Sequence, residues 1–173
     1  MNKYLILFLI ILTIYNCESD DICPESTLTT PRLVVTFYDE ENPEERKSVD
    51  NLGVYIVKNN ELTLINEING INTDSIAIPL RDDESVSNFK FCKDFSEDTP
   101  IIPSGLPDHV YFDYEINETF ISRACGFINN YSLSVALPYD PIDIPGPTNW
   151  ISEVIILNNS VTNENQSHVK IFH

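Results

Sequence analysis

The sequence predicts an all-β fold, a single two-sheet antiparallel sandwich that follows an N-terminal export signal. Apolar and polar residues alternate with period two along most of the chain, which is typical of strands with one buried face. Turn-forming residues interrupt this alternation roughly every 8 to 15 positions, and no long segment shows helical periodicity. About nine or ten short strands in one domain are enough to build two packed sheets.

Each expected strand carries its own row of apolar residues. The strands are expected at residues 32–38, 52–57, 62–65, 76–80, 89–91, 110–116, 120–125, 131–137, 150–157 and 168–172. Asn59 and Asn60 suggest a tight hairpin turn between the second and third strands, and the pair Asn117 and Glu118 suggests another turn. Pro79 lacks an amide donor, so its strand is expected to lie at a sheet edge or to be near its end at this residue. An immunoglobulin-like or related Greek-key arrangement is the expected topology.

Two proline-rich segments interrupt the strand pattern. Residues 99–107 and 138–147 are expected to be surface loops, because proline cannot serve in a central strand. The strand at residues 131–137 is expected to bury its odd-numbered residues, since these are the apolar ones. Together these segments and strands define one domain, expected to span residues 30–173.

The first residues predict a lipoprotein signal. Lys3 precedes an apolar run at residues 4–15, which is too short to span a bilayer and matches the core of an export signal. Cys17 stands where a bacterial lipoprotein carries the thiol that receives a diacylglycerol group, although Asn16 replaces the small residue usual before it. We therefore expect a signal peptide at residues 1–16 and lipidation of Cys17. An ordinary secretory signal without lipidation is the alternative.

The segment after Cys17 is acidic and is expected to be a tether at residues 17–29. Ser19, Asp20 and Asp21 resemble the export signal that sends some lipoproteins of Bacteroidota to the outside of the outer membrane. A plain solvated tether explains these three residues equally well. The expected location is the outer membrane, with the protein anchored by lipid on either the cell-surface or the periplasmic side.

The charge of the chain excludes one class of partner. The formal net charge is -17, and removal of residues 1–16 takes away Lys3 and no acid, which gives about -18. Nucleic-acid binding depends on lysine and arginine that replace counterions, so a nucleic-acid partner is not expected. Anionic lipid headgroups are disfavoured for the same reason. The apolar fraction of 42% is that of a folding chain rather than a disordered acidic tail.

Three cysteines remain if Cys17 is lipidated, so one disulfide and one free thiol are expected. The sequence leaves three pairings open among Cys23, Cys92 and Cys125. We favour Cys23 with Cys125, because closing a loop of about 100 residues stabilises most, by roughly 4.7 kcal/mol in the chain-entropy model. Cys92 is then expected to be a small apolar residue rather than a nucleophile.

Several short motifs occur in a characteristic order along the chain. They are Asp20-Asp21-Ile22-Cys23-Pro24-Glu25, Thr30-Pro31-Arg32-Leu33, Phe37-Tyr38-Asp39, the segment Thr73 to Leu80, Ser122-Arg123-Ala124-Cys125-Gly126, and the segment Val169 to His173. Together they resemble the domain of unknown function (DUF) 6452 family of flavobacterial lipoproteins. The resemblance implies a compact lipid-anchored domain and supplies no activity. It also favours the pairing of Cys23 with Cys125, since both cysteines lie in these motifs.

The sequence contains no catalytic or metal motif. A hydrolase brings a nucleophile, a base and an orienting acid together, and the spacing of His109, His168 and His173 does not indicate this. These histidines are expected at surface or edge positions. No paired spacing of cysteine or histidine suggests zinc. We therefore predict a protein that is not an enzyme and that has no metal and no cofactor.

Three acidic sites and one arginine are weaker candidates for ligand binding. The acidic segments at residues 39–41 and 82–84, and the pair Asp140 and Asp143, could bind calcium, but solvated acidic surfaces explain them more simply. Arg123 is expected on a strand face with Ile121 and Cys125, partly buried and paired with an acid. A stabilising ion pair is the simpler role for Arg123, and a clamp for a ligand carboxylate is the alternative.

These observations leave three functions open. A non-catalytic binding or structural protein of the cell envelope, with an envelope protein or a glycan as partner, is the one we favour. A periplasm-facing accessory factor for envelope assembly or transport is the second, and it would be favoured if the surface address were absent. A hydrolytic enzyme is the third and the least expected.

Overall fold

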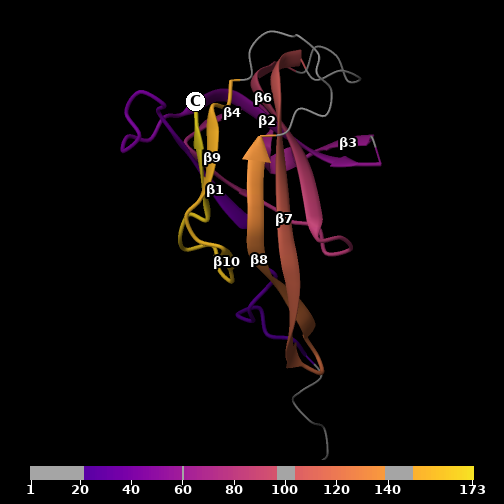
Figure 1. The fold of residues 1–173 in the computed structure, drawn as a ribbon. Helices are drawn as coiled ribbons and strands as arrows, with labels where there is room; N and C mark the ends of the chain where they lie inside the picture. The colour runs from indigo at the N-terminus through magenta and orange to yellow at the C-terminus, as the bar shows by residue number, and fades with distance from the viewer. Residues whose placement is uncertain (1–21, 60, 97–103, 139–149) are drawn as a thin grey trace, which may run out of the picture. The chain divides into compact units, whose positions relative to one another are not determined.

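The computed structural model describes residues 22–59, 61–96, 104–138 and 150–173, and these form an almost all-β structure (Figure 1). The chain divides into two compact units. The sandwich unit comprises Thr30–Glu118 and Asn129–His173. The hairpin unit comprises Thr119–Ile128 together with the N-terminal segment up to Thr29, of which residues 22–29 are described. Residues 119–128 thus belong with the N-terminal segment, although the sequence suggested that they are part of the sandwich.

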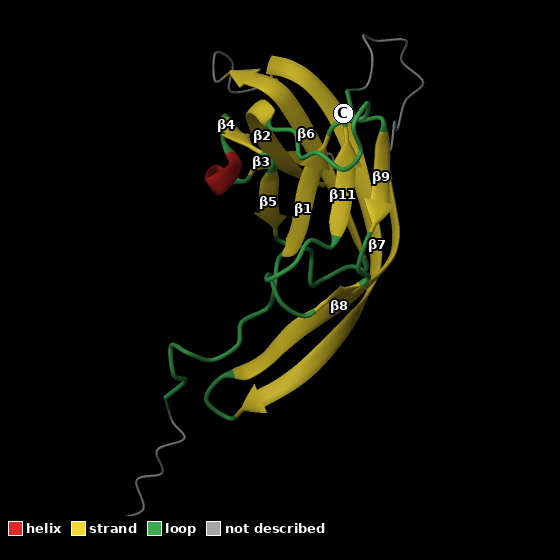
Figure 2. Ribbon diagram, turned by 90° about the vertical axis from the view of Figure 1, so that its left-hand side faces the viewer, coloured by secondary structure: helices red, strands yellow, loops and turns green. Residues whose placement is uncertain are grey.

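Two sheets form the sandwich, as the sequence predicted. The four-stranded sheet has the order β5 (Ser75–Ile78), β1 (Leu33–Tyr38), β11 (Val169–Phe172) and β9 (Glu153–Ile156), which Figure 2 shows side by side. The seven-stranded sheet has the order β10 (Ser160–Val161), β8 (Gly126–Pro138), β7 (Ser104–Ser122), β6 (Val86–Ser96), β2 (Val49–Lys58) and β3 (Glu61–Leu64), with β4 (Ile71–Thr73) also paired to β2. A single 3-10 turn, η2 (Asn66–Ile68), is the only helical element of the described residues.

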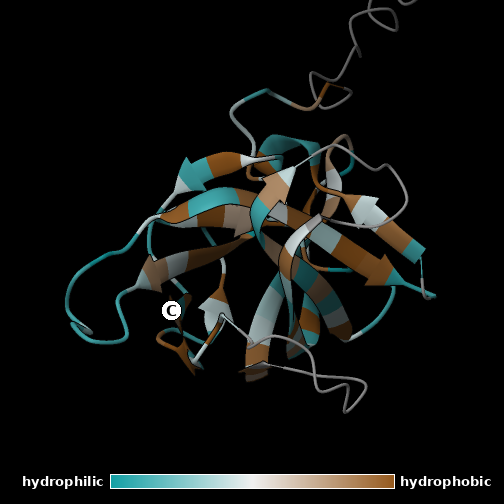
Figure 3. Ribbon diagram, turned by 90° about the horizontal axis from the view of Figure 1, so that it is seen from above, coloured by the Kyte–Doolittle hydropathy of each residue, from teal (hydrophilic) through white to brown (hydrophobic). Residues whose placement is uncertain are grey.

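Alternation along the strands builds the core between the sheets. Figure 3 shows hydrophobic and hydrophilic segments following each other along single strands. Phe37 of β1 and Phe91 of β6 meet across the two sheets with ring centroids 6.4 Å apart, and Phe89 continues the contact to Phe112 of β7 at 5.9 Å. All four rings are fully buried. Such edge-to-face pairs add to the stabilisation that burial itself provides.

The first and last strands of the sandwich unit pair in parallel, which the expected antiparallel sandwich did not include. Val35 of β1 lies opposite Val169 of β11, and Tyr38 lies opposite Phe172. Antiparallel pairing is enforced only where a short hairpin joins two strands. Because more than a hundred residues separate β1 from β11, either direction was open to this pair.

β7 is one continuous strand of 19 residues, so the predicted turn at Asn117 and Glu118 is wrong. The Asn117 side chain donates a hydrogen bond to the Ser132 hydroxyl of β8 at 3.1 Å, which gives a turn-favouring residue a partner within the sheet. The true turn spans residues 123–125, where the Cys125 amide donates to the Ser122 hydroxyl at 3.0 Å. The predicted loop at residues 99–107 is also partly wrong, because β7 begins at Ser104; residues 97–103 lie outside the described residues.

β8 changes the face that it buries. Tyr131 and Leu133 are buried as predicted, but Ala136 is the next buried residue and Leu137 is 54% exposed. The alternation therefore shifts by one position between Leu133 and Ala136, and the expectation that all odd-numbered residues are buried is wrong for Leu137. The loop expected at residues 138–147 lies outside the described residues from 139 on.

Candidate functional site

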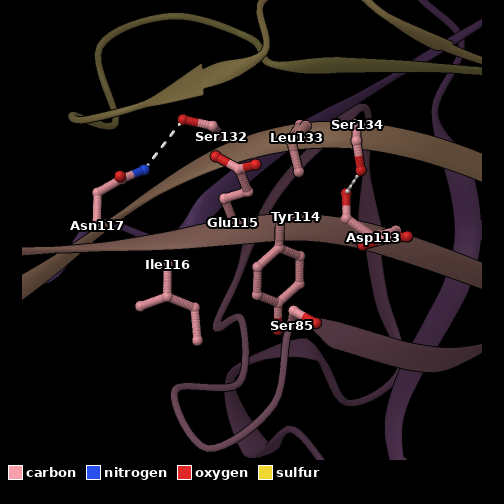
Figure 4. Close-up of a pocket in the computed structure, with 9 residues that line it drawn as sticks. All are labelled: Ser85, Asp113, Tyr114, Glu115, Ile116, Asn117, Ser132, Leu133 and Ser134. Atoms are coloured by element: carbon pink, nitrogen blue, oxygen red, sulfur yellow. Dashed lines mark hydrogen bonds between the residues drawn. The ribbon is translucent and has the colours of Figure 1, made fainter.

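A groove of about 680 Å³ lies along β7 and β8 of the sandwich unit (Figure 4). Most of its lining residues are polar. They are Ser85, Asp113, Tyr114, Glu115, Ile116, Asn117, Ser132, Leu133 and Ser134. Strands were predicted at residues 110–116 and 131–137, which carry most of these residues, but Asn117 was predicted in a turn and no site was predicted there. Their only signal was the run of polar residues on the solvent side of two neighbouring strands.

The alternation of β7 places the polar residues of the groove on one side of the strand and the aromatic Tyr114 on the other (Figure 4). Figure 4 shows Glu115 and Asn117 extending from β7 toward Ser132 of β8, whereas Tyr114 extends to the other side of the strand. The Ser134 hydroxyl donates a hydrogen bond to the backbone carbonyl of Asp113 at 3.1 Å. This bond and the one between Asn117 and Ser132 hold the polar side chains of the two strands beside each other.

Tyr114 forms a rigid inner wall of the groove. Its hydroxyl donates to the Arg81 carbonyl at 2.9 Å and shares a hydrogen bond with the Ser87 hydroxyl at 2.6 Å. Its ring meets that of Tyr131 edge to face at 5.3 Å. Burial raises the pKa of Tyr114, and burial raises the pKa of Tyr131 to about 12. Both phenols therefore stay neutral near pH 7 and serve as structure rather than as bases.

The described lining of the groove is rich in hydrogen-bonding groups. Asp113 and Glu115 supply carboxylates, and the serines and Asn117 supply hydroxyls and an amide. Among the described residues that line it there is no histidine, cysteine, lysine or arginine. Within the described ranges, no group of three His, Cys, Asp or Glu side chains could hold a metal ion. Carboxylates and hydroxyls that face solvent in a row can accept and donate hydrogen bonds to the hydroxyl groups of a ligand.

The acidic loop at residues 82–84 is occupied by protein cations. The Arg81 guanidinium binds both oxygens of Asp83 at 2.9 Å and Glu84 at 2.8 Å, and Lys58 reaches Asp83 at 2.8 Å. The hydrogen bonds from Arg81 lower the pKa of Asp83. In the other acidic segment, Asp39 accepts a hydrogen bond from a backbone amide, which lowers its pKa. Ion pairing within the protein therefore accounts for the loop at residues 82–84 better than calcium does.

Two of the three histidines are buried, contrary to the expected surface or edge positions. His168 is 0% exposed, and its Nδ1 accepts a hydrogen bond from the Val34 amide at 3.0 Å. Its Nε2 is buried without a partner among the described residues. His173 is also buried and packs edge to face against Trp150 at 5.4 Å. Burial lowers the pKa of both histidines. His109 is half-buried on β7, and none of the three lines the groove.

The cysteines adopt the pairing that the sequence favoured. A disulfide joins Cys23 to Cys125, 102 positions apart in the sequence, and both belong to the hairpin unit. Cys92 is free and buried in β6, and burial raises the pKa of its thiol to about 11. A protonated, enclosed thiol is a poor nucleophile, in agreement with the apolar role predicted for Cys92.

Arg123 does not lie on a strand face. It lies in the turn between β7 and β8, its side chain is exposed, and the described residues give it no ion pair. The predicted place on a strand face is therefore wrong, because β7 ends at Ser122. The remaining predicted site residues lie outside the described residues. These are Cys17, Ser19, Asp20, Asp21, Asp140 and Asp143.

The sequence from residue 51 onward identifies a family. Residues 51–173, more than two thirds of the chain, match the family described as "Family of unknown function (DUF6452)". The chain belongs to this DUF6452 family. The matched residues begin within β2 and include every described lining residue of the groove of this DUF6452 domain, but they do not include the predicted N-terminal signal. Neither the curated proteins nor the solved structures gave a match. In the described part of the chain, no helix has the length and apolar character needed to cross a membrane.

Proposed function

We propose that this DUF6452 protein is a lipid-anchored protein of the cell envelope that binds a glycan in the groove of β7 and β8 without catalysing a reaction. The groove supports binding because its lining combines carboxylates, hydroxyls and an amide and contains no nucleophile with a neighbouring base. An envelope protein is the other partner that such a polar surface could accept.

The charge of the surface favours a neutral ligand. Asp113 and Glu115 are acidic, the described lining residues include no cation, and the chain as a whole carries a formal charge of -17. An anionic ligand would be repelled. Sugar hydroxyls donate hydrogen bonds to carboxylates, and such charge-assisted bonds are stronger than neutral ones. A glycan without acidic groups is therefore the ligand that the groove suits best.

The disulfide supports export of the protein. Disulfides persist in oxidising compartments and are rare in the cytosol. Cys23, which is bonded to Cys125, stands six positions after Cys17 and follows the predicted signal closely. Lipidation of Cys17 and a place at the outer membrane, on the surface or on the periplasmic side, are parts of the proposal.

Titration with defined oligosaccharides tests the binding site. We expect neutral envelope oligosaccharides to shift the NMR amide signals of β7 and β8, and Glu115→Gln together with Ser134→Ala to weaken binding about tenfold or more, because two hydrogen bonds are lost. Glu61→Gln, an exposed acid of β3, is the matched control and should bind as the unaltered protein does. Shifts that are absent at millimolar sugar, or that lie away from β7 and β8, would contradict the proposed site.

Protease accessibility on intact and lysed cells tests the location. Digestion of the tagged protein on intact cells would place it on the surface and would make Ser19, Asp20 and Asp21 an export address. Protection until lysis would place it in the periplasm and would favour the accessory-factor function. Release of the Cys17→Ala variant from the membrane fraction is expected in both cases, and its retention would contradict lipid anchoring.

A further inference from the structure

We infer that the end of the β7–β8 hairpin, with Phe120 and Phe127 at its surface, rests on the bilayer that holds the lipid of Cys17. The inference rests on the proposed lipid anchor and adds a second membrane contact to it. Both aromatic residues belong to the hairpin unit, as do the disulfide and the segment that leads to Cys17.

The two phenylalanines form an exposed pair. Phe120 near the end of β7 is 57% exposed and Phe127 at the start of β8 is 63% exposed. Their ring centroids lie 5.2 Å apart. Ile22 and Leu28, in the N-terminal segment of the same unit, are exposed as well. Apolar residues that gather in one small unit without burial usually mark a contact surface.

The disulfide limits how far this pair can lie from the lipid. Cys17 and Cys23 are six positions apart, and an extended chain spans at most about 3.6 Å per residue, so their Cα atoms are no more than about 22 Å apart. The Cα atoms of Cys23 and Cys125 are 4.9 Å apart. The turn between the two aromatic residues is therefore held within about 27 Å of the lipidated residue.

The tether would be much longer without this disulfide. The first fixed point of the tether would be Thr30, where the sandwich unit begins, thirteen positions from Cys17 and as far as about 47 Å from it. A shorter tether raises the effective concentration of a surface near its target. A weak affinity of two aromatic rings for the interface is then sufficient for contact.

The charges of the hairpin unit identify the kind of lipid surface. Its described residues carry one acid, Glu25, and one cation, the exposed Arg123 in the turn between the two phenylalanines. A guanidinium can bind the phosphate of a lipid headgroup, while aromatic and aliphatic side chains enter the boundary between headgroups and acyl chains. The acidic segment at residues 18–21 would be repelled by anionic lipid. The expected surface is a bilayer of zwitterionic headgroups.

Fluorescence quenching in vesicles tests the contact. The Phe127→Trp variant of the mature lipoprotein is purified from membranes and placed in phosphatidylcholine vesicles with brominated acyl chains. We expect its added fluorescence to fall about twofold, because side chains at the interface reach the upper acyl region. The chain has a single tryptophan, Trp150, whose signal is measured on the unaltered protein and subtracted.

Leu157→Trp is the matched control. Leu157 is 50% exposed and belongs to the sandwich unit. We expect bromine to leave its fluorescence unchanged. Equal quenching at both positions would show general adsorption of the chain and would overturn the inference. A lack of quenching in Phe127→Trp would also overturn it.

The intact mass of the same preparation separates the two proposals. An acylated Cys17 without quenching at Phe127→Trp leaves the lipid anchor standing and overturns the membrane contact. A Cys17 without acyl chains contradicts both. Replacing Cys23 and Cys125 by serine in the Phe127→Trp variant should weaken the contact about threefold, since effective concentration falls with roughly the 3/2 power of tether length. Unchanged quenching in that variant would overturn the role of the disulfide.

Discussion

Phenylalanine occupies opposite environments in the two units of this protein. Phe112 on β7 is fully buried in the sandwich unit between the rings and aliphatic side chains of both sheets. Phe120, eight positions further along the same strand, is 57% exposed in the hairpin unit. The same residue type therefore stabilises the fold in one unit and is left to solvent in the other.

The two units differ in what holds them together. The sandwich unit has a continuous hydrophobic core, and burial of apolar surface is the main favourable term in its folding. The hairpin unit has none of the residues of that core, and a disulfide links its two segments. The sandwich core therefore supplies stability, while the hairpin unit supplies a surface whose two segments are joined by a covalent bond.

Truncation of one phenylalanine in each unit should give the largest difference. Phe112→Ala should lower the free energy of unfolding by about 3–5 kcal/mol, because it removes buried surface and leaves a cavity. Phe127→Ala should change it by no more than about 0.5 kcal/mol, because the side chain is exposed. Urea unfolding followed by the fluorescence of Trp150, which packs against Phe37, measures both. Equal losses would contradict the division of roles.

Removal of the disulfide should have the next largest effect. The disulfide closes a loop that contains β1 to β7. Replacing both Cys23 and Cys125 by serine should therefore lower the free energy of unfolding by about 2–5 kcal/mol. Reduction of the disulfide in the unaltered protein should lower the free energy of unfolding by the same amount, which appears as a lower urea midpoint. A midpoint that does not move would show that the hairpin unit contributes nothing to the stability of the sandwich.

Two glycines with positive φ sharpen the comparison. A Cβ at Gly105 (φ 114°) would collide with the backbone carbonyl of Lys93, whereas a Cβ at Gly126 (φ 70°) would meet nothing within 4 Å. Gly105→Ala should therefore cost about 3 kcal/mol of unfolding free energy from strain and displacement. Gly126→Ala should cost only about 1 kcal/mol, from its backbone conformation. Thermal unfolding of both variants compares them, and a larger loss at Gly126 would contradict this order.

Acidification should act on the sandwich unit alone and more weakly. Burial lowers the pKa of His168 and His173 from the ordinary value of 6.5, so below pH 6.5 the unfolded chain binds protons that the folded chain does not. Stability is therefore present above that pH and lost as pH falls, by at most about 1.4 kcal/mol per pH unit for each histidine.

Urea unfolding at pH 7.5, 6.5 and 5.5 measures this slope, and His168→Gln should reduce it. The hairpin unit has no histidine, so the amide protection factors of residues 119–128, which are corrected for the intrinsic pH dependence of exchange, should not change over the same range. A slope that His168→Gln leaves unchanged would assign the effect to other groups.

Local patterns in the sequence predicted much of the fold. The alternation in β1 predicted its buried face, and Pro79 correctly indicated that β5 is an edge strand. Asn59 indicated the turn between β2 and β3, where its φ of 51° is a conformation that asparagine tolerates. These features depend on residues close together in the sequence, so periodicity and turn chemistry are sufficient to find them.

Only the tertiary structure decided the features that depend on distant partners. The Asn117 side chain donates a hydrogen bond to Ser132 of β8, and β7 continues where the sequence predicted a turn. The Val34 amide donates a hydrogen bond to His168, which is buried in the core. The groove also arises only because β7 and β8 lie side by side. The sequence by itself determined which residues alternate and where the cysteines stand. Which faces are covered, and which phenylalanines remain exposed, depends on where the second sheet ends, and no local pattern records that.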